Sequence, residues 1–305
     1  MNSPTTDQAA FDAHRGLLFR VAYDLLGGVA DAEDVVQETW LRWSAADRGD
    51  VENPRAYLVQ IATRQALNRI RSNRSRRETY IGPWLPEPLV ASVATPDPAD
   101  EVVDRAERSE TISMAMLVVL ETLSPAERAV FVLREVFGMS HDEVAQALDR
   151  SPASVRQLAH RAREHVQARR PRFPADDREQ RRVTEEFLLA CLTGDLAALT
   201  ELLTPDVTLT SDGGGKVRAA RRPILGADKA ARFLIGVAHE AAQLSIRFAL
   251  VNGTLGVVGY QDDTPITVVL LDLVDGRIAQ ILIVSNPDKL ASVAVIDPPP
   301  GTHVG

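Results

Sequence analysis

Several side chains that can contact nucleic acid occur together near the middle of the chain. The stretch Ser151–Arg163 holds five of them: Ser154, Arg156, Gln157, His160 and Arg161. Arginine can form two hydrogen bonds with guanine, and glutamine can do the same with adenine. Residues 150–172 contain seven arginines and a single acid, so phosphate is also a suitable ligand. A surface helix with solvated arginines is the alternative explanation.

Two short helical patterns would position these side chains. The first covers 140–148, and the break Asp149-Arg150-Ser151 separates it from the second. Ser151 can cap the second helix, and Pro152 suits its first position. Apolar residues recur on one side of that helix: Val155, Leu158, Ala159, Ala162 and Val166. A helix, a short turn and a second helix with a basic outer face place the second helix in the major groove of DNA.

A second basic segment lies upstream. Asn53-Pro54 starts a helical pattern, and residues 55–77 contain seven arginines and no acid. The candidate contact residues of this segment are Arg64, Asn68, Arg71 and Arg74. Because Tyr57 and Tyr80 flank it, the segment suits single-stranded or melted nucleic acid, which binds cations and stacks on aromatic rings.

Two more helices are predicted before this segment. Phe11–Leu26 is amphipathic and ends at Gly27-Gly28, and Asp31 can cap the next helix. In that next helix three residues have core spacing: Val36, Trp40 and Trp43. Three others form a separate exposed face: Asp34, Glu38 and Leu41. This face is either simply solvated or a docking surface for a basic partner.

Composition limits the remaining options. The chain has 305 residues, of which 45% are hydrophobic, so two or three domains with their own cores are expected. The net charge of −8 excludes a uniformly basic surface. Cys191 is the sole cysteine, so an intramolecular disulfide or a cysteine-cluster zinc site is excluded, and we expect neither metal nor cofactor. No secretory signal or bilayer-spanning run is visible, so we expect a cytoplasmic protein without membrane binding.

Two stretches resemble extracytoplasmic-function (ECF) sigma factors over about residues 8–172. D-A-E-D-V-V-Q-E-T-W-L-R-W followed by N-P-R-A-Y-L-V-Q-I-A-T-R-Q-A-L-N resembles their region-2 domain. L-S-P-A-E-R-A-V-F-V-L-R-E-V-F-G-M-S-H-D-E-V-A-Q-A-L-D-R-S-P-A-S-V-R-Q-L-A-H-R-A-R resembles their region-4 domain. A one-component helix-turn-helix regulator with a sensor domain is the alternative, but it leaves residues 55–77 unexplained.

The resemblance implies core RNA polymerase and promoter DNA as partners. The clamp helices of the largest polymerase subunit would meet Asp34, Gln37, Glu38 and Leu41. The flap of the second-largest subunit is a further implied contact. Residues 53–77 would bind and help melt the minus-10 element, and residues 151–163 would bind the minus-35 element.

Residues 79–110 are predicted to form an extended acidic linker. Prolines at 83, 86, 88, 96 and 98 exclude a helix there. Trp84, Leu85 and Leu89 are too apolar for an idle tether, so they either pack on neighbouring helices or are gripped by another domain. A helical pattern resumes over Glu101–Leu123, with these core positions: Ile112, Ala115, Met116, Val119 and Leu123.

The C-terminal part predicts an α+β cone, with helices packed on a curved antiparallel sheet. Helices are expected at 183–203, broken at Gly194-Asp195, and at 228–240. Strands are expected at 207–210, 244–251, 255–260, 267–274 and 277–285, with hairpin turns at Asn252-Gly253 and Asp275-Gly276. Such a fold usually encloses a pocket. The whole chain is thus multidomain, two all-α domains and this cone, with these expected boundaries: 1–78, 79–110, 111–172, 179–290 and a disordered tail 291–305.

The C-terminal part resembles SnoaL-like domains through G-D-L-A-A-L-T-E-L-L-T-P-D-V-T-L-T-S-D. D-G-G-G-K, N-P-D-K-L and the linker motif W-L-P-E-P resemble the signature of sigma factors that carry such a domain as a built-in regulator. This likeness implies control in cis, without a separate anti-sigma factor. It assigns the control to Trp84, Leu85, Pro86, Asp212, Gly213, Gly214, Gly215, Lys216, Asn286, Pro287, Asp288, Lys289 and Leu290.

Catalysis by this domain is not expected. Related cyclases and isomerases use a pocket Asp or His for proton transfer, and the candidates here are Asp206, Asp212 and His239. No His-Asp pair stands at helical or strand spacing, and Asp212 before three glycines suits an Asx turn. A sensor of an unknown small ligand remains an alternative to purely intramolecular control.

Overall fold

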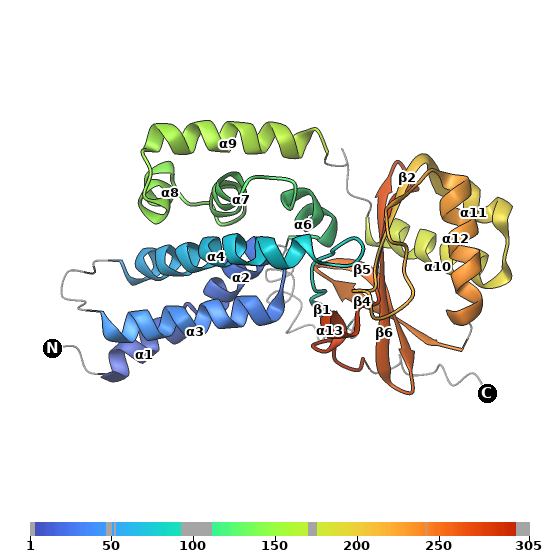
Figure 1. Ribbon diagram of the computed structural model, residues 1–305, viewed down its shortest axis with the longest axis horizontal. Coiled ribbons are helices and arrows are strands. Elements are labelled where there is room, and N and C mark those ends of the chain that lie inside the picture. Colours follow the sequence, from blue (N-terminus) through green and yellow to red (C-terminus); the bar gives the residue numbers. More distant parts are fainter. Residues whose placement is uncertain are drawn as a thin grey trace. The chain divides into compact units, whose positions relative to one another are not determined.

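The computed structural model describes residues 4–46, 51, 53–92, 112–169, 176–241 and 243–296 (Figure 1). The side chains of residues 4–7, 74–78, 92 and 239–242 are outside this description. The chain divides into two compact units. Unit 1 comprises residues 1–79 and 116–170, and unit 2 comprises residues 80–115 and 171–305. Within the described ranges, no helix has the length and apolar character needed to cross a membrane.

Unit 1 begins with α1 (Pro4–Asp12), α2 (Arg15–Leu26), α3 (Val29–Ala45) and α4 (Pro54–Glu78). The single helix expected over Phe11–Leu26 is wrong, because the chain breaks after Asp12 and Phe11 packs on Trp40 from α1, with ring centroids 5.0 Å apart. Gly27 ends α2, as predicted, and it has the left-handed conformation (φ 70°).

The predicted cap of α3 is also wrong. Gly28 is the N-cap, and Asp31 lies in the first turn. The carboxylate of Asp31 is engaged by α4, since it accepts hydrogen bonds from Arg69 (2.8 Å) and Asn73 (2.8 Å). The core positions predicted for α3 agree with the structure better than its predicted cap does, because Val36 and Trp43 are buried and Trp40 is half-buried.

The second half of unit 1 contains most of α6 (Met114–Leu120), then α7 (Pro125–Phe131), the π-helical turn η1 (Val132–Val136), α8 (His141–Leu148) and α9 (Pro152–Gln167). The helix expected over Glu101–Leu123 is seven residues long within the described residues. The predicted core positions of this segment are partly wrong. Ile112 and Leu123 are buried, as predicted. The other buried side chains are Met114, Leu117 and Leu120, whereas the predicted Ala115, Met116 and Val119 are only partly buried.

Unit 2 is built on a seven-stranded sheet in the order β1-β4-β5-β6-β7-β2-β3. The strands are β1 (Val90–Ser92), β2 (Leu203–Asp212), β3 (Ile224–Leu225), β4 (Ser245–Val251), β5 (Thr254–Gln261), β6 (Thr264–Val274) and β7 (Arg277–Val284). Its helices are α10 (Asp177–Thr193), α11 (Leu196–Leu202), α12 (Ala227–Ala241) and the short α13 (Pro287–Leu290). The α+β cone is confirmed: α10, α11 and α12 lie on one side of the sheet and share a core with it (Figure 1).

Two details of the sheet differ from the expected antiparallel meander. β2 pairs with β7 in parallel, and the linker strand β1 pairs with the edge strand β4. The predicted hairpin turns are confirmed, since Asn252 and Gly253 (φ 49° and 73°) and Asp275 and Gly276 (φ 50° and 74°) have positive φ. After α13, Val293 and Ile296 are buried, so the disordered tail expected from residue 291 does not begin there. Residues 297–305 lie outside the described residues.

Candidate functional site

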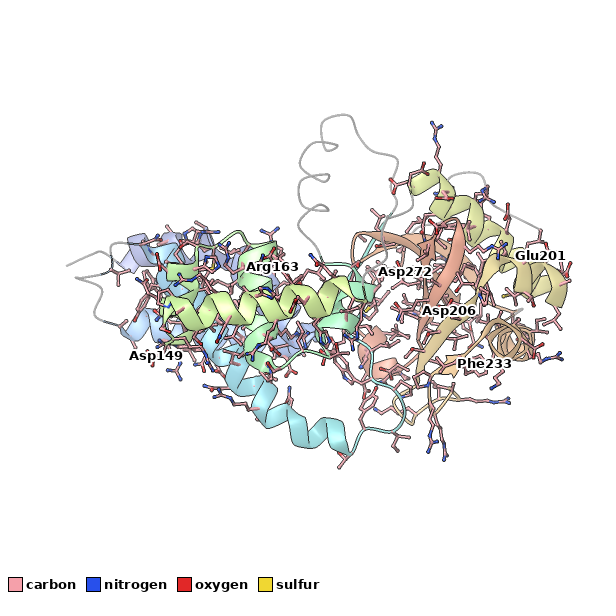
Figure 2. The ribbon with its side chains drawn as sticks, turned by 90° about the horizontal axis from the view of Figure 1, so that it is seen from above. Asp149, Arg163, Glu201, Asp206, Phe233 and Asp272 are labelled. Carbon is pink, nitrogen blue, oxygen red and sulfur yellow. The ribbon has the colours of Figure 1, made fainter. Side chains whose placement is uncertain are left out.

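Local capping residues determine where the two helices of the helix-turn-helix begin and end. Ser140 caps α8 in a capping box with Glu143, and Ser151 caps α9 by accepting the Ser154 N–H (3.2 Å). Asp149 ends α8 in the left-handed conformation (φ 54°), which turns the chain into α9. The predicted break, the cap and Pro152 at the first position are confirmed, and Figure 2 labels Asp149 at the turn and Arg163 on α9.

The buried face of α9 consists of the apolar residues predicted for it, and the candidate contact residues lie outside this face. Arg156, Gln157, His160 and Arg161 are exposed, and Ser154 is half-buried. Two of them have partners within the unit: Arg161 pairs with Glu127 (3.2 Å), and His160 lies 3.2 Å from Glu164. Among the described residues, Arg156 and Gln157 make no ion pair or side-chain hydrogen bond. The N-terminal half of α9 therefore offers an arginine and an amide to an outside ligand.

α8 covers part of the α4 surface that carries the candidate contact residues. Arg64 donates to the carbonyl of Ala147 (3.2 Å), and Gln60 donates to that of Gln146 (2.8 Å). Both carbonyls belong to the last turn of α8, where backbone acceptors lack helical partners. Asn68 and Arg71 remain exposed, and Arg74 has no described side chain. Promoter contact by Arg64 is therefore incompatible with this packing.

The acidic face of α3 is partly neutralised from α4. Asp34, Gln37 and Glu38 are exposed, and Leu41 is 64% exposed. Arg69 forms an ion pair with Asp34 and lies 3.8 Å from Glu38. One arginine of the basic segment thus stabilises the face of α3 rather than facing outward, and the sequence pattern did not distinguish it from its neighbours.

Arg128 joins the two helical groups of unit 1. It is 3% exposed, donates to the carbonyl of Asp24 (3.2 and 3.3 Å) and pairs with Glu121. The Asp24 carboxyl is itself buried, and burial raises its pKa to about 8 despite the nearby Arg128 and Arg20. The contact between the groups therefore contains a carboxyl group that is neutral over much of the ordinary pH range.

Unit 2 holds the linker through the carboxylate of Asp212, which is fully buried. One oxygen accepts the Tyr80 hydroxyl (2.6 Å) and the Gly214 N–H (3.0 Å). The other accepts the Leu85 N–H (2.8 Å) and the Lys289 ammonium (2.7 Å). The predicted Asx turn is present, but it is one of four contacts. We call Asp212, Asn286 and Lys289, with the linker residues that they contact, the linker site.

Lys289 and Asn286 complete the linker site. Lys289 is 6% exposed, donates to the Leu85 carbonyl and lies over the ring of Trp84, 4.1 Å from its centroid. Asn286 donates to the Tyr80 hydroxyl (2.8 Å) and caps α13, in which Pro287 takes the first position and Leu290 is buried. Desolvation and Asp212 raise the pKa of Tyr80, so its hydroxyl stays a donor. Charge, hydrogen bonds and ring contacts thus converge on residues 80–85.

The glycines of D-G-G-G-K have a steric role at this site. A Cβ on Gly214 (φ 60°) would overlap the Asn286 amide, and one on Gly215 (φ 72°) would lie 2.9 Å from Ile81. A Cβ on Gly213 would lie 2.7 Å from the carbonyl of Val217. Lys216 and Asp288 form an exposed ion pair (2.7 Å) beside the site. Gly215 therefore lets the loop approach the linker at Ile81, whereas Gly214 lets it approach Asn286 and Gly213 lets it fold back on itself.

The linker is also held as a strand. β1 pairs with β4 from Val90 to Ser92, and Asn252 exchanges two hydrogen bonds with Leu89: its side chain accepts the Leu89 N–H (3.1 Å), and its N–H donates to the Leu89 carbonyl (2.9 Å). Leu85, Pro86 and Pro88 are buried. The predicted extended conformation is confirmed for the described part of the linker.

Sequence reasoning missed the polar contacts of two residues of this region. Tyr80 was interpreted as a ring flanking a nucleic-acid segment and as an apolar linker residue that packs on helices or is gripped by another domain, but its hydroxyl is bound in the linker site. Asn252 was interpreted only as a turn residue. Neither partner could be found from local spacing, because Tyr80 and Asp212 are 132 positions apart and Leu89 and Asn252 are 163 apart.

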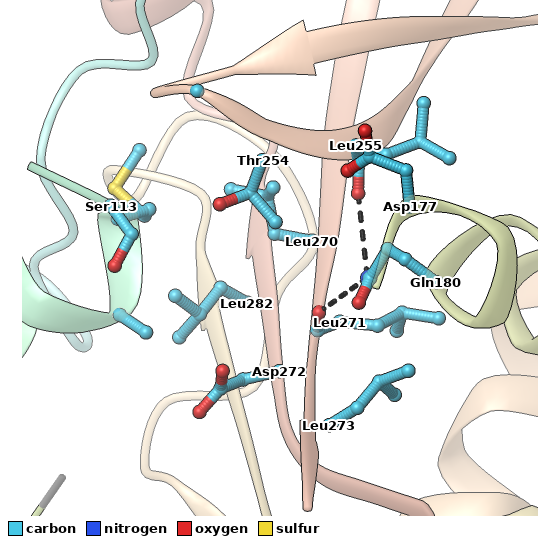
Figure 3. A pocket seen from close by; sticks show the side chains of 13 residues that line it. Ser113, Asp177, Gln180, Thr254, Leu255, Leu270, Leu271, Asp272, Leu273 and Leu282 are labelled. Carbon is cyan, nitrogen blue, oxygen red and sulfur yellow. Dashed lines mark hydrogen bonds between the residues drawn. The ribbon is translucent and has the colours of Figure 1, made fainter. Parts of the chain in front are cut away.

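Two hollows lie among the described residues of unit 2. The smaller, about 250 Å³, lies between Ser113–Ala115, which follow the linker, and strands β5 to β7 (Figure 3). Asp272 lines it, and burial raises the pKa of this carboxyl to about 6. Gln180 closes one side by donating to the Leu271 carbonyl (2.8 Å). Residues that precede and follow the undescribed part of the chain at 93–111 thus lie in unit 2.

The larger hollow is a cavity of about 450 Å³ between α10, α12 and the sheet. Phe233 lines it, whereas Asp206 is exposed on β2 and does not (Figure 2). Its described lining contains no Asp, Glu or His, and the carboxylate of Asp212 is committed to the linker. His239 has no described side chain. No acid or base for proton transfer is therefore found among the described residues around the cavity.

Comparison with known proteins gives the class of the chain. Residues 10–76 match the family Sigma-70 region 2, and residues 113–166 match Sigma-70, region 4. The chain therefore carries the two domains of a sigma-70-type factor, in the order that the sequence motifs indicated. A plain helix-turn-helix regulator is excluded, because it has no region 2.

Relatives extend the match over nearly the whole chain. The ECF RNA polymerase sigma factor SigJ of Mycobacterium tuberculosis is 41% identical over 92% of this chain and 91% of its own length. The probable ECF RNA polymerase sigma factor SigI of the same organism is 33% identical over 92% and 94%. The crystal structure of M. tuberculosis SigJ matches with a TM-score of 0.73 and 36% identity over 93% of this chain and 98% of that chain.

The chain belongs to the ECF RNA polymerase sigma factors. It is a transcription initiation factor that directs RNA polymerase to promoters, not an enzyme, and its C-terminal domain is the α+β cone described above. The resemblance to ECF sigma factors seen in the sequence is confirmed.

Proposed function

We propose that this sigma factor binds core RNA polymerase through α3 and promoter DNA through α4 and α9, in the cytoplasm. Asp34, Gln37 and Glu38 would face the basic surface of the clamp helices, with Leu41 as an exposed apolar anchor. Arg64, Asn68, Arg71 and Arg74 would contact the melted minus-10 strand, and the exposed side chains of α9 would contact the minus-35 element. The region-4 domain would also meet the polymerase flap.

The observation that carries the regulatory part of the proposal is the α4–α8 contact. The minus-10 and minus-35 elements lie roughly 25 base pairs apart, which is about 85 Å along the duplex. Arg64 of α4 is hydrogen-bonded to Ala147 of α8, and α8 packs on α9. The two reading helices cannot bind both elements while this contact persists. Promoter binding therefore requires the helical groups to separate.

The linker sets how far they can separate. Fully extended, the chain from Thr79 to Met116 spans at most about 130 Å, which exceeds the distance between the elements. Bound to unit 2, Tyr80–Ser92 follows the surface of one domain, and Ser113–Ala115 lies against the same domain. The SnoaL-like domain would thus restrain the linker in cis, and no separate anti-sigma factor would be needed.

The substitution Asp212→Asn tests this control in the full chain. It keeps the side-chain volume but removes the charge that binds Lys289 and orients Tyr80. Transcription is measured with core polymerase on promoter fragments that the reconstituted holoenzyme selects from genomic DNA. We expect the variant to copurify with core polymerase and to increase sigma-dependent transcription several-fold.

The matched control is Asp228→Asn, which removes an exposed carboxylate paired with Arg232 on α12. It should leave transcription unchanged. Hydrogen exchange of the linker reports separately whether Asp212→Asn releases it. If the linker is released and transcription does not change, control in cis is wrong. If the unaltered chain does not copurify with core polymerase, the proposed polymerase contact is wrong.

A further inference from the structure

The cavity of unit 2 interrupts an otherwise packed core. Phe233 of α12, Val269 of β6 and Ile283 of β7 point inward from central elements, yet each is only partly buried because it borders the cavity. Protein cores seldom leave voids larger than a water molecule. A pocket of about 450 Å³ with mainly apolar walls, open to solvent beside the exposed Val217 and Arg218, has the size and character of a small-molecule site.

The polar groups of the wall define the ligand further. The hydroxyls of Thr267 and Ser285 lie 3.0 Å apart, and Ser211 is 4% exposed beside them. Among the described lining residues, Arg218 alone carries a charge, and it is exposed rather than buried in the wall. The described wall therefore offers no buried counter-ion to a charged ligand of either sign. Since a dry cavity of about 150 Å³ holds one benzene, this one has room for roughly three rings.

The cavity and the linker site share the same backbone. Ser211 lines the cavity and the next residue, Asp212, binds the linker; Ser285 lines the cavity and the next residue is Asn286. The Ser285 N–H donates to the Asp212 carbonyl (2.8 Å), which ties the two strand ends together. A ligand that packs against these serines therefore also supports the ends of β2 and β7 that present the linker site.

We propose that this cavity binds a neutral, apolar small molecule with a hydroxyl or keto oxygen, and that its binding stabilises the linker site. The oxygen would bond to the Ser211, Thr267 and Ser285 hydroxyls, and the apolar body would fill the space between α12 and the sheet. The inference rests on the proposed control in cis, to which it adds the signal. The ligand would bind the state in which unit 2 holds the linker better than the state in which the linker is released. It would therefore shift the equilibrium between these two states towards the held linker.

The test uses the full chain and the probe 6-propionyl-2-(dimethylamino)naphthalene, a neutral two-ring ketone whose emission shifts to the blue in apolar surroundings. Two variants place the same side chain on opposite faces of α12: Ala238→Trp fills the cavity, and Lys229→Trp is exposed. We expect saturable 1:1 binding to the unaltered chain and to Lys229→Trp, and at least tenfold weaker binding to folded Ala238→Trp. No saturable binding to the unaltered chain, or equal binding to folded Ala238→Trp, overturns the site.

A second measurement does not depend on the folding of Ala238→Trp. Cys191 is the sole cysteine and lines the cavity, and burial raises the pKa of its thiol to about 12, so it alkylates slowly. Saturating probe should slow N-ethylmaleimide addition at Cys191 at least fivefold, as followed by intact mass. Unchanged alkylation with the probe bound places the probe elsewhere and refutes the site.

The link to the linker site is measured by hydrogen exchange without polymerase. Probe binding should slow exchange of the Leu85 and Leu89 amides, which donate to Asp212 and Asn252. If the probe binds in the cavity and this exchange does not change, the link is wrong. The Asp212→Asn transcription test contains no probe, so it judges control in cis independently of the cavity.

Discussion

Lys289→Met should release the linker from unit 2. Lys289 and Asp212 are 7% and 0% exposed in their side chains, and their charged atoms lie 2.7 Å apart. Removing one partner of a buried ion pair costs about 3–5 kcal/mol, because it leaves the other charge buried and unpaired. The variant also loses the donor to the Leu85 carbonyl and the cation over Trp84. Methionine is unbranched and only one atom shorter than lysine, so the loss is chiefly electrostatic.

The effect can be read at the linker itself. A loss of about 3–5 kcal/mol in the local opening free energy accelerates exchange of the Leu85 amide by a factor of roughly 10² to 5 × 10³. Hydrogen-exchange mass spectrometry on peptides that cover residues 80–92 measures this directly. The same experiment on α9 peptides should show little change, since that helix caps itself through Ser151.

Lys216→Met is the matched control. Lys216 pairs with Asp288 at the same distance, 2.7 Å, but the two side chains are 54% and 64% exposed. Exposed pairs contribute about 0–1 kcal/mol, so exchange of Leu85 should rise less than about fivefold. Equal effects of Lys289→Met and Lys216→Met would refute the reasoning, because burial would then not govern the strength of the linker site.

Three further predictions test other parts of the molecule. Arg156→Ala should weaken binding to minus-35-containing promoters by about 1–3 kcal/mol in holoenzyme gel-shift titrations, whereas unchanged affinity would mean that a different face of α9 meets DNA. Asp24→Asn should raise the free energy of unfolding of unit 1 above about pH 6, as followed by urea denaturation. The folded pKa of Asp24, about 8, lies above the ordinary value of 3.8, so stability from the neutral carboxyl is present at low pH and is lost as pH rises towards 8; a parallel pH profile for the variant would contradict this. Gly214→Ala should loosen the linker site, since its Cβ would overlap Asn286 at positive φ, and unchanged Leu85 exchange would show that the loop adapts.

Local signals were read correctly from the sequence. Ser151-Pro152 begins α9, Asn252-Gly253 and Asp275-Gly276 form hairpin turns, and Gly194-Asp195 separates α10 from α11. Each of these depends on backbone preferences of adjacent residues. The break between α1 and α2 lacks such a signal, since it depends on Phe11 packing against Trp40.

Non-local pairings could not be predicted from spacing. The parallel contact of β2 with β7 and the addition of β1 to β4 join segments far apart in the chain. The motif likeness named Asp212 and Lys289, but not the buried ion pair between them or the Tyr80 hydroxyl that Asp212 accepts. Likewise, counting arginines in 55–77 could not separate Arg69, which pairs with α3, from Asn68 and Arg71, which are exposed.

The central claim is that promoter binding separates α4 from α9. Fluorescent dyes at Ser72→Cys on α4 and Gln167→Cys on α9, in a Cys191→Ser background, would report this distance. α4 packs on α8 and α8 packs on α9, so two helix-to-helix spacings give a distance of about 20 Å between the labelled helices in the free chain. Energy transfer between the dyes should therefore be high in the free chain. It should nearly vanish in the complex with core polymerase and promoter DNA, at about 85 Å. High transfer retained in a transcribing complex would contradict the account.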